Sequence, residues 1–370
     1  MWKSIFVYYY DNYDNLIREL IPKLLPNSVI SQEFPNQIKR FYFTRHWIGG
    51  PHIRLNFDIN ENADWETLYR TISLQIEGFL REYPSKSILV DENWHKNTSV
   101  LLRLEHQKVR GNEMELHPDN YWKMHDYEIR SSMYGGEKGA KLAEDFYSDA
   151  THLICELFAY TKGKLDDRID FFIQMMVALV GCTHVNFYYS YRSHFEGHMH
   201  PLKNKVEIKD SINKSYLSKK DWYVSLVKKT FHQVERIKAG ESVQDNGILK
   251  SWVELVTRYY QLIMDEVQLG LSPFHTDVIN FSSISDFHQE ANENQIVQEF
   301  FSTSYFQVQR FLLSFMYGIF NFSGITPIKR AYLCYIAAES IEIVTGKNWD
   351  LILREAAEEK KRYMDNGVNS

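Results

Sequence analysis

The segment Phe41–Phe57, FYFTRHWIGGPHIRLNF, decides how the N-terminal part of this chain folds. Two runs rich in aromatic and aliphatic residues flank Ile48-Gly49-Gly50-Pro51, where the glycines and the proline indicate a tight turn. After the turn, apolar Ile53, Leu55 and Phe57 alternate with polar residues, which is the period of a strand with one buried face. The segment therefore predicts two antiparallel strands, Arg40–Trp47 and His52–Phe57, whose second strand carries His52, Arg54 and Asn56 on one face.

The sequence around this hairpin predicts the order β-α-β-β-α. Ser4–Tyr10 is rich in strand-forming residues, and apolar residues at helical spacing follow it until Pro26. Asp11 or Asn12 is expected to cap that first helix. A second helix is expected from Asn62 or Asp64 to about Tyr83, just before Pro84.

Residues 85–127 are polar and mixed, with strand-like pieces such as Val100–Leu104, and Tyr127–Tyr134 is expected to be a further strand. From Glu137 the pattern becomes helical, so the fold class is α+β, with a mostly antiparallel N-terminal sheet and a mainly helical C-terminal half. We expect a sheet subdomain at 1–136, with a possible leader-peptide-binding insertion at 85–127, and a helical subdomain at 137–370, together forming one compact unit. Helices are expected near 137–162, 166–182, 219–238, 247–269, 294–321, 327–345 and 348–363, and irregular chain at 183–217 and 270–293.

Composition excludes several classes of protein. Of the 370 residues, 44% are hydrophobic and 24% are charged, as in soluble globular proteins, and the net charge of -6 disfavours a nucleic-acid partner. The N-terminus lacks the features of a signal peptide, and no apolar run reaches the roughly 18 residues of a membrane span, so a cytoplasmic protein without a membrane partner is expected. Cys155, Cys182 and Cys334 lie far apart in apolar runs, which predicts buried thiols rather than disulfides or a zinc module.

The signatures of common cofactor-dependent and hydrolytic enzymes are absent. There is no P-loop, no GxGxxG motif after a strand and no GxSxG motif, so we expect no nucleotide or other cofactor. Aromatic residues make up 15% of the chain. They indicate either a core built from large rings or a cleft that holds an apolar ligand with tyrosine hydroxyls as polar contacts.

Three groups of residues are candidates for chemistry. His52, Arg54 and Asn56, with Arg45 and His46 across the turn, form either an anion site or an ordinary solvated sheet face. The amides after Tyr134, in Tyr134-Gly135-Gly136, could bind an oxyanion or simply form a turn that requires positive φ. In Tyr188–His200, His194 and His198 have i,i+4 spacing but no third ligand is evident, so we expect no metal and interpret the histidines and tyrosines as proton-transfer groups.

Four blocks in this order resemble a known family, the C-terminal elimination domain of class I lantibiotic dehydratases, which also contains thiopeptide-forming enzymes. Phe41–Phe57 resembles its Gly-Pro-His-(Leu/Ile)-Arg-Leu-Arg-Phe segment, and YEIRSSMYGG at Tyr127–Gly136 resembles its strand and Tyr-Gly-Gly turn. Glu144–Asp149 resembles the acidic helix that follows, and Tyr191–Gly197 resembles a Ser-His-x-Glu-Gly stretch. The resemblance implies a role on ribosomally made precursor peptides.

The residues that the family uses to eliminate glutamate are largely replaced in this chain. Arg54 is kept, whereas Asn56 stands where the family has its second arginine. Met133 replaces a family arginine and Arg130 a family glutamate. In the family's His-x-x-x-Asn-Arg stretch, the aligned segment Tyr317–Phe322 keeps Asn321 but has Tyr317 for the histidine and Phe322 for the arginine.

The resemblance with these replacements favours the thiopeptide pyridine synthase branch of the family. Such an enzyme, a cyclase and lyase, joins two dehydroalanines in a formal [4+2] aza-cycloaddition and releases the leader peptide. The open alternatives are a glutamate-eliminating split dehydratase domain and a non-catalytic leader-peptide-binding member. Other biosynthetic enzymes are possible partners. The expected catalytic residues are His52, Arg54, Tyr188, Ser190 and His194, and the expected substrate-binding residues are Arg45, Asn56, Arg130, Tyr134 and Tyr317.

Overall fold

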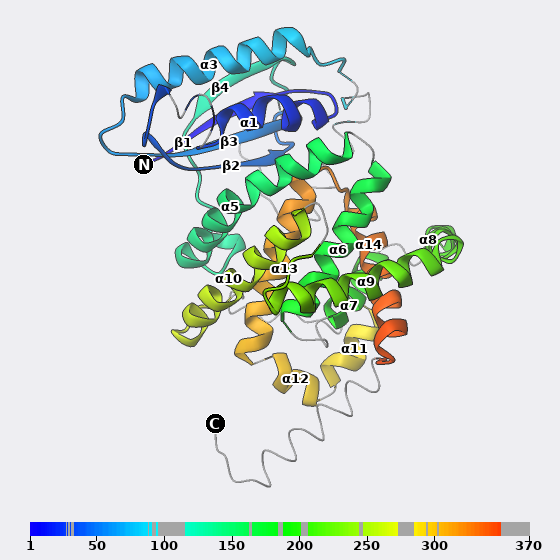
Figure 1. Cartoon of the computed structure of the whole chain (residues 1–370). Coiled ribbons are helices and arrows are strands. Elements are labelled where there is room, and N and C mark those ends of the chain that lie inside the picture. Colours follow the sequence, from blue (N-terminus) through cyan, green and yellow to red (C-terminus); the bar gives the residue numbers. More distant parts are fainter. Residues whose placement is uncertain are drawn as a thin grey trace. The chain divides into compact units, whose positions relative to one another are not determined.

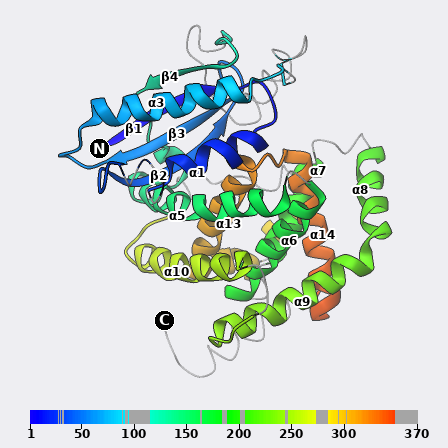
Figure 2. The ribbon, with the colours of Figure 1, turned by 45° about the horizontal axis from the view of Figure 1, so that its top comes forward.

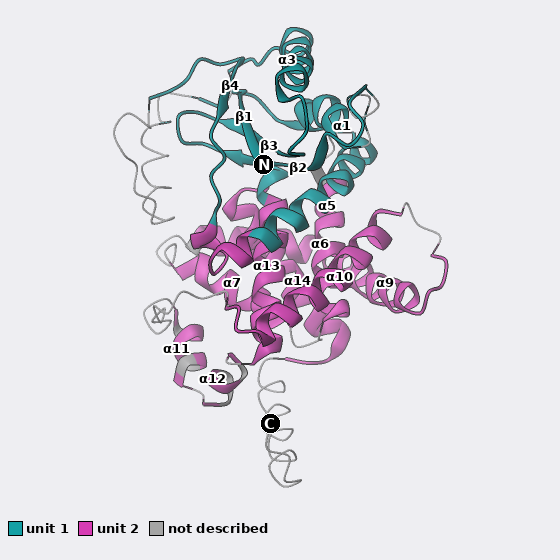
Figure 3. Ribbon diagram, turned by 90° about the vertical axis from the view of Figure 1, so that its left-hand side faces the viewer, with its two compact units in different colours: residues 1–130, 141–163, 321–324 teal, residues 131–140, 164–320, 325–370 magenta. Residues whose placement is uncertain are grey.

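The computed structural model divides the chain into two compact units (Figure 3). Unit 1 consists of Met1–Arg130, Lys141–Gly163 and Asn321–Gly324, and unit 2 of Ser131–Ala140, Lys164–Phe320 and Ile325–Ser370. The two units therefore interleave along the chain, and the division at residue 136 stays a prediction about subdomains. The structure describes residues 1–26, 28, 30, 33–87, 89, 90, 94, 115–162, 165–183, 188–200, 206–243, 247–272, 285–293, 295–301 and 303–348.

Unit 1 is built on a four-stranded antiparallel sheet with the strand order β2-β3-β1-β4 (Figure 1). The strands are β1 (Trp2–Tyr8), β2 (Ile38–His46), β3 (His52–Ile59) and β4 (Tyr121–His125). The predicted hairpin is confirmed: β2 pairs with β3, and Gly49 and Gly50 in the turn have φ of 76° and 108°. These angles lie in the left-handed region that favours glycine. The strand β4 was not foreseen.

One face of the sheet is covered by helices. The π-helical turn η1 (Leu16–Leu20) continues into α1 (Ile21–Leu24), and α3 (Trp65–Glu82) packs beside η1. The predicted cap of α3 is confirmed, because the Asp64 side chain accepts a hydrogen bond from the Thr67 amide. The side chains of Ile5, Val7, Ile53 and Leu55 are fully buried, so this face of the sheet forms the core of unit 1.

Unit 2 is helical, as predicted, and its helix α6 packs against α9, α10 and α14 (Figure 2). Buried tyrosine and tryptophan donors are satisfied by α6 carbonyls, since Tyr191 donates to Met176 O at 2.7 Å and Trp252 donates to Met175 O at 2.9 Å. The helices are α5 (Glu137–Thr161, mostly in unit 1), α6 (Leu165–Cys182), α7 (Tyr189–Met199), α8 (Val206–Ser218), α9 (Lys220–Lys238), α10 (Ile248–Gln268), α11 (Asp286–Glu293), α12 (Gln295–Phe301), α13 (Ser304–Phe322) and α14 (Pro327–Thr345).

Several expected elements differ from the observed ones. Tyr127–Tyr134 is not a strand: it is irregular until the 3-10 turn η2 (Ser131–Met133), because β4 takes the sheet edge beside β1 and the chain leaves the sheet after it. The ranges 183–217 and 270–293, expected to be irregular, contain α7, α8 and α11. The helix expected at 294–321 is two helices, α12 and α13. The predictions at Val100–Leu104, in most of 85–127 and at 348–363 fall largely outside the described residues.

The three cysteines are unpaired thiols. Cys155 and Cys334 are buried, as predicted, whereas Cys182 is partly exposed at the end of α6. The expectation that all three are buried is therefore wrong for Cys182, because it is the last residue of α6, where the helix end leaves part of it exposed. In the part of the chain that the structure describes, no helix combines the length and apolarity needed to cross a membrane.

Candidate functional site

The sheet face opposite the helices carries the first group of candidate residues, all in unit 1. Strand pairing places His52 between Tyr8 and His46, Arg54 between Phe6 and Thr44, and Asn56 between Ser4 and Tyr42. Directly opposite residues in a sheet lie on the same face and contact one another. The predicted proximity of His52, Arg54, Asn56 and His46 is therefore present.

Arg45 is not part of this face. It pairs with Ile53, and its guanidinium lies 4.4 Å from the ring centroid of Tyr13 and donates to Asn321 O at 3.4 Å. Because successive side chains of a strand point to opposite faces, Arg45 cannot join its neighbours Thr44 and His46. Arg45 therefore lies on the opposite face of the sheet from Arg54, and the two predicted substrate-binding residues do not share one site.

His52 is held as a neutral ring that orients Arg54. Its Nδ1 lies 2.8 Å from Gly50 O, and a carbonyl can only accept, so Nδ1 carries the proton. The unprotonated Nε2 then accepts from Arg54 Nε at 3.3 Å. Burial and the nearby Arg54 charge lower the pKa of His52 to about 3. His52 is therefore suited to positioning Arg54 and poorly suited to donating a proton from Nε2.

Two arginines meet at the centre of this face. The Arg54 guanidinium lies 4.5 Å from the Phe6 ring centroid and 3.5 Å from a Glu128 oxygen, and Arg130 donates to Thr44 at 3.5 Å. Burial and the charge of Arg130 lower the pKa of Arg54 to about 10. The two side chains line a cavity of only about 10 Å³ together with Ser4, Phe6, Tyr42, Thr44, Asn56, Asp126, Tyr127 and Glu128. The lining therefore carries two guanidinium groups and two carboxylates, and the guanidinium groups offer planar donors to an oxygen acceptor.

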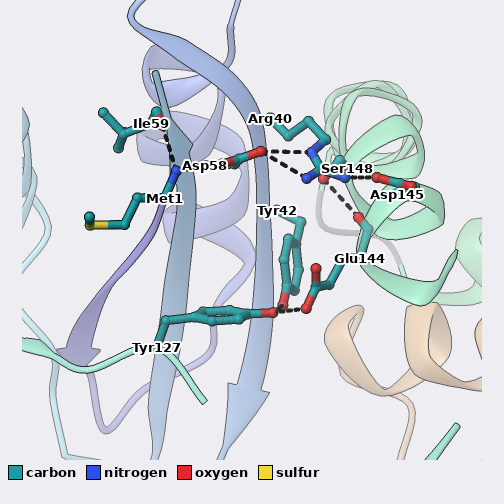
Figure 4. Close-up of polar contacts among 9 residues, drawn as sticks. All are labelled: Met1, Arg40, Tyr42, Asp58, Ile59, Tyr127, Glu144, Asp145 and Ser148. Atoms are coloured by element: carbon teal, nitrogen blue, oxygen red, sulfur yellow. Dashed lines mark hydrogen bonds and ion pairs between the residues drawn. The ribbon is translucent and has the colours of Figure 1, made fainter. Parts of the chain in front are cut away.

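A polar network connects the edge of this face to α5 (Figure 4). The hydroxyls of Tyr42 and Tyr127 lie 2.8 Å apart, and Tyr127 donates to the buried Glu144 carboxylate. Burial raises the pKa of Glu144, and it raises the pKa of Tyr127 far above its ordinary value. Arg40 bridges Asp58 and Asp145. The network thus fixes Tyr127 beside the two arginines, and it shows that Glu144 and Asp145 of the third sequence block bond to residues of unit 1.

The main chain after Tyr134 forms a turn in unit 2. Gly135 and Gly136 have φ of 71° and 108°, and the Gly136 amide donates to Ser131 O at 2.9 Å. Tyr134 is buried and makes an edge-to-face contact with Phe315 at 5.6 Å between ring centroids. A Cβ at Gly139 would lie 1.7 Å from Tyr134 O, so this glycine is required by close packing. These contacts agree with the interpretation of the glycines as a turn.

The second group of candidate residues surrounds α7 in unit 2. Ser190, His194 and His198 are spaced by four residues and share one face of the helix. His194 Nδ1 lies 2.8 Å from the Tyr317 hydroxyl of α13, which in turn lies 3.1 Å from Cys334 Sγ of α14. Burial lowers the pKa of His194 well below 6.5 and raises that of Tyr317 well above 10. Both groups are therefore neutral near neutral pH and are linked by one hydrogen bond.

His198 repeats the arrangement of His52. Its Nδ1 lies 2.8 Å from His194 O, and its Nε2 accepts from Arg330 at 2.9 Å. Burial and Arg330 lower the pKa of His198. Sequence spacing did not indicate Arg330, Arg310 or Cys334, because these residues come from α13 and α14 and carry no local motif.

The other predicted residues in this region are Tyr188, which precedes α7, and Ser190 in its first turn. The Tyr188 hydroxyl donates to Lys347 O at 2.7 Å, and burial raises its pKa. Ser190 is buried. The neighbouring Ser193 hydroxyl lies 2.8 Å from His288 Nε2, and His288 Nδ1 lies 2.5 Å from the Ser285 hydroxyl. The contact between Ser193 and His288 therefore joins α7 to α11.

A separate surface pocket of about 570 Å³ also lies in unit 2. None of the predicted site residues lines it. It is bordered by Asp167, Ile169, Asp170, Leu217, Ser218, Lys219, Lys220, Asp221, Trp222 and Tyr223. Within the described residues, no group of three or more histidine, cysteine, aspartate or glutamate side chains is arranged to hold a metal ion.

Comparisons with known proteins agree with this architecture. A model of the family described as the lantibiotic biosynthesis dehydratase C-terminal domain matches residues 2–341, and the chain belongs to this family. A search of curated proteins found no match.

Among solved structures, the chain is similar in fold to the pyridine synthase TbtD from thiomuracin biosynthesis, with a TM-score of 0.70 and 19% identity over 93% of this chain and 99% of that one. It is also similar to TsrL, with a TM-score of 0.68 and 16% identity over 96% of this chain and 98% of that one. At these identities the similarity shows the fold.

Proposed function

We propose that this chain is a pyridine synthase of thiopeptide biosynthesis. Its substrate is a ribosomally made precursor peptide with a leader and a core that contains two dehydroalanines. The product is a macrocycle closed by a pyridine ring, and the leader leaves as a carboxamide. Membership of the lantibiotic dehydratase C-terminal family and a fold that spans nearly all of a pyridine synthase support this proposal.

The replaced elimination residues are consistent with the proposal. Phe322 is buried against Phe43 and Tyr147, with ring centroids 6.2 Å and 4.9 Å away, so it cannot bind a leaving carboxylate. Met133 is 58% exposed and carries no charge. Elimination of glutamate needs cations for that carboxylate, and these two positions supply none.

The observation that carries the proposal is the hydrogen bond between His194 and Tyr317. The reaction begins when a backbone amide moves its proton from nitrogen to oxygen, which gives a 2-azadiene. The azadiene and the second dehydroalanine then form two carbon–carbon bonds, and loss of water and of the leader carboxamide makes the ring aromatic. A neutral histidine and a neutral tyrosine joined at 2.8 Å can accept one proton and donate another with no net charge. This pair therefore suits the tautomerisation.

Unit 1 is proposed to bind the peptide. Arg54 and Arg130 would contact carboxylate or carbonyl oxygens of the substrate, with Asn56 beside them. Strand β4 is at one edge of the sheet in the described residues, and an edge strand can take an added peptide strand. The leader-binding role predicted for 85–127 would use this edge.

The test is mass spectrometry of the purified protein with a linear peptide that bears two dehydroalanines. A macrocycle and an equimolar leader carboxamide are expected. Loss of glutamate without ring formation from a glutamylated peptide would instead identify an eliminase. An unchanged peptide that nevertheless binds would identify a non-catalytic leader-binding protein, and either of these results overturns the proposal.

Two tyrosine variants test the proposed role of the Tyr317 hydroxyl. Tyr317→Phe removes the hydroxyl next to His194, and turnover should fall about 100-fold, the lower end for a lost acid–base group. Tyr335→Phe on α14 is the matched control, because its hydroxyl donates to Asn213 at 2.9 Å, away from His194. Equal turnover of the two variants would exclude Tyr317 from the proton transfer.

A further inference from the structure

The surface pocket of about 570 Å³ is lined by the start of α6 and by the junction of α8 with α9, all in unit 2 (Figure 2). Sites that hold a small ligand or a side chain have volumes of about 300–1,000 Å³, so the pocket has the size of a binding site. None of the residues assigned to the proposed reaction lines it. The pocket therefore lies outside the machinery of pyridine synthesis.

An exposed indole in a fixed orientation forms part of the pocket. Trp222 of α9 is 58% exposed, and its Nε1–H lies 3.2 Å and 3.1 Å from the two carboxylate oxygens of Asp170 on α6. These contacts hold the ring and place negative charge at its edge, which polarises the indole. Leu217, which is 57% exposed, adds apolar surface to the same pocket. An accessible tryptophan face of this kind is the best aromatic partner for a cation.

Carboxylates outnumber ammonium groups around this indole. Asp167 lies three residues before Asp170, so both side chains are on one side of α6, and Asp221 is in the first turn of α9. Lys219 and Lys220 also line the pocket, but both are exposed, and long lysine side chains keep their ammonium groups in water. The pocket thus combines an aromatic face with an excess of carboxylate, which is complementary to an organic cation.

We propose that this pocket binds the guanidinium group of an arginine side chain in a peptide. A guanidinium is planar and weakly hydrated, so it can stack on the Trp222 face while its N–H groups donate to the Asp167 and Asp170 carboxylates. A lysine ammonium is compact and strongly hydrated, so it fits this arrangement less well. The aliphatic stem of the bound arginine would contact Leu217. The site does not depend on pyridine synthesis and is tested without a dehydroalanine peptide.

Binding is measured by titrating the ¹⁵N-labelled protein and following the Trp222 Nε1–H resonance, which is assigned by its absence from Trp222→Leu. The probe is Nα-acetyl-L-arginine N-methylamide, and the uncharged counterpart is the citrulline derivative. The arginine probe should bind about tenfold more tightly than the citrulline probe, because only a cation makes charge-assisted hydrogen bonds to the carboxylates. Equal binding of these two probes would overturn the cation site. Tighter binding of the corresponding lysine derivative would overturn the guanidinium assignment.

A further probe distinguishes a peptide arginine from a free guanidinium compound. Methylguanidine carries the same cation without the aliphatic stem, so it should bind less tightly than the arginine probe, which also covers Leu217. Methylguanidine that binds as tightly as the arginine probe would overturn the assignment to a peptide.

Two variants test whether the arginine probe binds in this pocket, with affinities measured from the resonances of the probe. Asp167→Asn removes one carboxylate, and Trp222→Leu removes the aromatic face but keeps an apolar side chain. Both positions are exposed, so the fold should be kept, and each variant should weaken binding about fivefold. The matched control is Asp210→Asn, at an exposed carboxylate of α8 that does not line the pocket, and it should bind as the wild type does. An affinity equal to that of the control in either variant contradicts the proposal.

Discussion

His52 and His198 occupy the same chemical arrangement in different units. Each donates Nδ1–H to a backbone carbonyl and accepts an arginine N–H at Nε2. The carbonyl can only accept and the arginine can only donate, so the tautomer follows from the partners. In both places the histidine ring accepts a hydrogen bond from an arginine, Arg54 or Arg330, and is held in one tautomer.

The neutral state of His52 predicts how stability depends on pH. Its pKa is about 3 in the folded chain and 6.5 ordinarily, so between these values only the unfolded chain binds the proton. Stability from His52 is fully present above pH 6.5 and falls as the pH drops toward 3, by about 2 kcal/mol near pH 5. His52→Gln, neutral at every pH, should make the decline of urea-unfolding free energy between about pH 7 and pH 5 less steep.

The control for this measurement is His152→Gln, which changes a histidine that is 66% exposed on α5. Its pH dependence should match the wild type. If His52→Gln also keeps the wild-type slope, the buried neutral state of His52 is disproved.

Tyr127 is expected to stabilise unit 1 through its hydroxyl. Tyr127→Phe leaves the buried Glu144 carboxylate without one donor and Tyr42 without its partner. The free energy of unfolding should fall by about 1–3 kcal/mol, as measured by urea denaturation. Tyr160→Phe, at a tyrosine that is 59% exposed on α5, should have no measurable effect. Equal stability of the two variants would show that the Tyr127–Glu144 bond adds nothing.

At the scale of elements, α7 is attached to α14 both by packing, with the Phe195 and Tyr335 ring centroids 4.8 Å apart, and by an ion-pair cluster. Arg192 of α7 lies 2.6 Å from Glu339 and 3.2 Å from Glu342, and these carboxylates also raise the pKa of Arg192. The ion pairs of Arg192 with the two carboxylates are partly exposed, so solvent screening limits their net contribution to stability. Since α7 carries His194 and α14 carries Cys334 and Arg330, this attachment sets the geometry around the His194–Tyr317 pair.

Arg192→Met should lower the unfolding free energy by about 1–2 kcal/mol, because two carboxylates lose their cation while the apolar stem is retained. Arg192→Lys keeps the charge and should lose less. Thermal and urea denaturation would measure both variants. A methionine variant as stable as the wild type would mean that apolar packing alone joins the two helices.

At the scale of the whole molecule, unit 1 is completed by chain segments that lie far from its sheet in sequence. Phe146 and Tyr147 of α5 and Phe322 are buried in unit 1, although the sheet ends before residue 131. A fragment of residues 1–136 should therefore lack cooperative unfolding, whereas residues 1–163 regain α5 and should be more ordered. Circular dichroism with urea would compare them. A cooperative transition of equal midpoint in both fragments would contradict this dependence.

The sequence was sufficient to predict the elements whose pattern is local. The β2–β3 hairpin follows from its Gly-Gly-Pro turn and period-2 alternation, the α3 start from Asp64, and the helical second half from its periodicity. It also identified the face with His52, Arg54 and Asn56. It failed at α7, because aromatic and polar residues on all sides of that helix leave little amphipathic contrast.

Only the tertiary structure decided which candidates meet. Arg45 is excluded from the Arg54 face by strand register, and Arg130 reaches that face from an irregular segment. Three helices, α7, α13 and α14, bring together His194, Tyr317, Cys334 and Arg330. More than a hundred residues of chain lie between α7 and α13. No local spacing encodes such a meeting, since it depends on helix packing over long sequence separations. The charge state of these groups likewise depends on burial, which the sequence alone does not reveal.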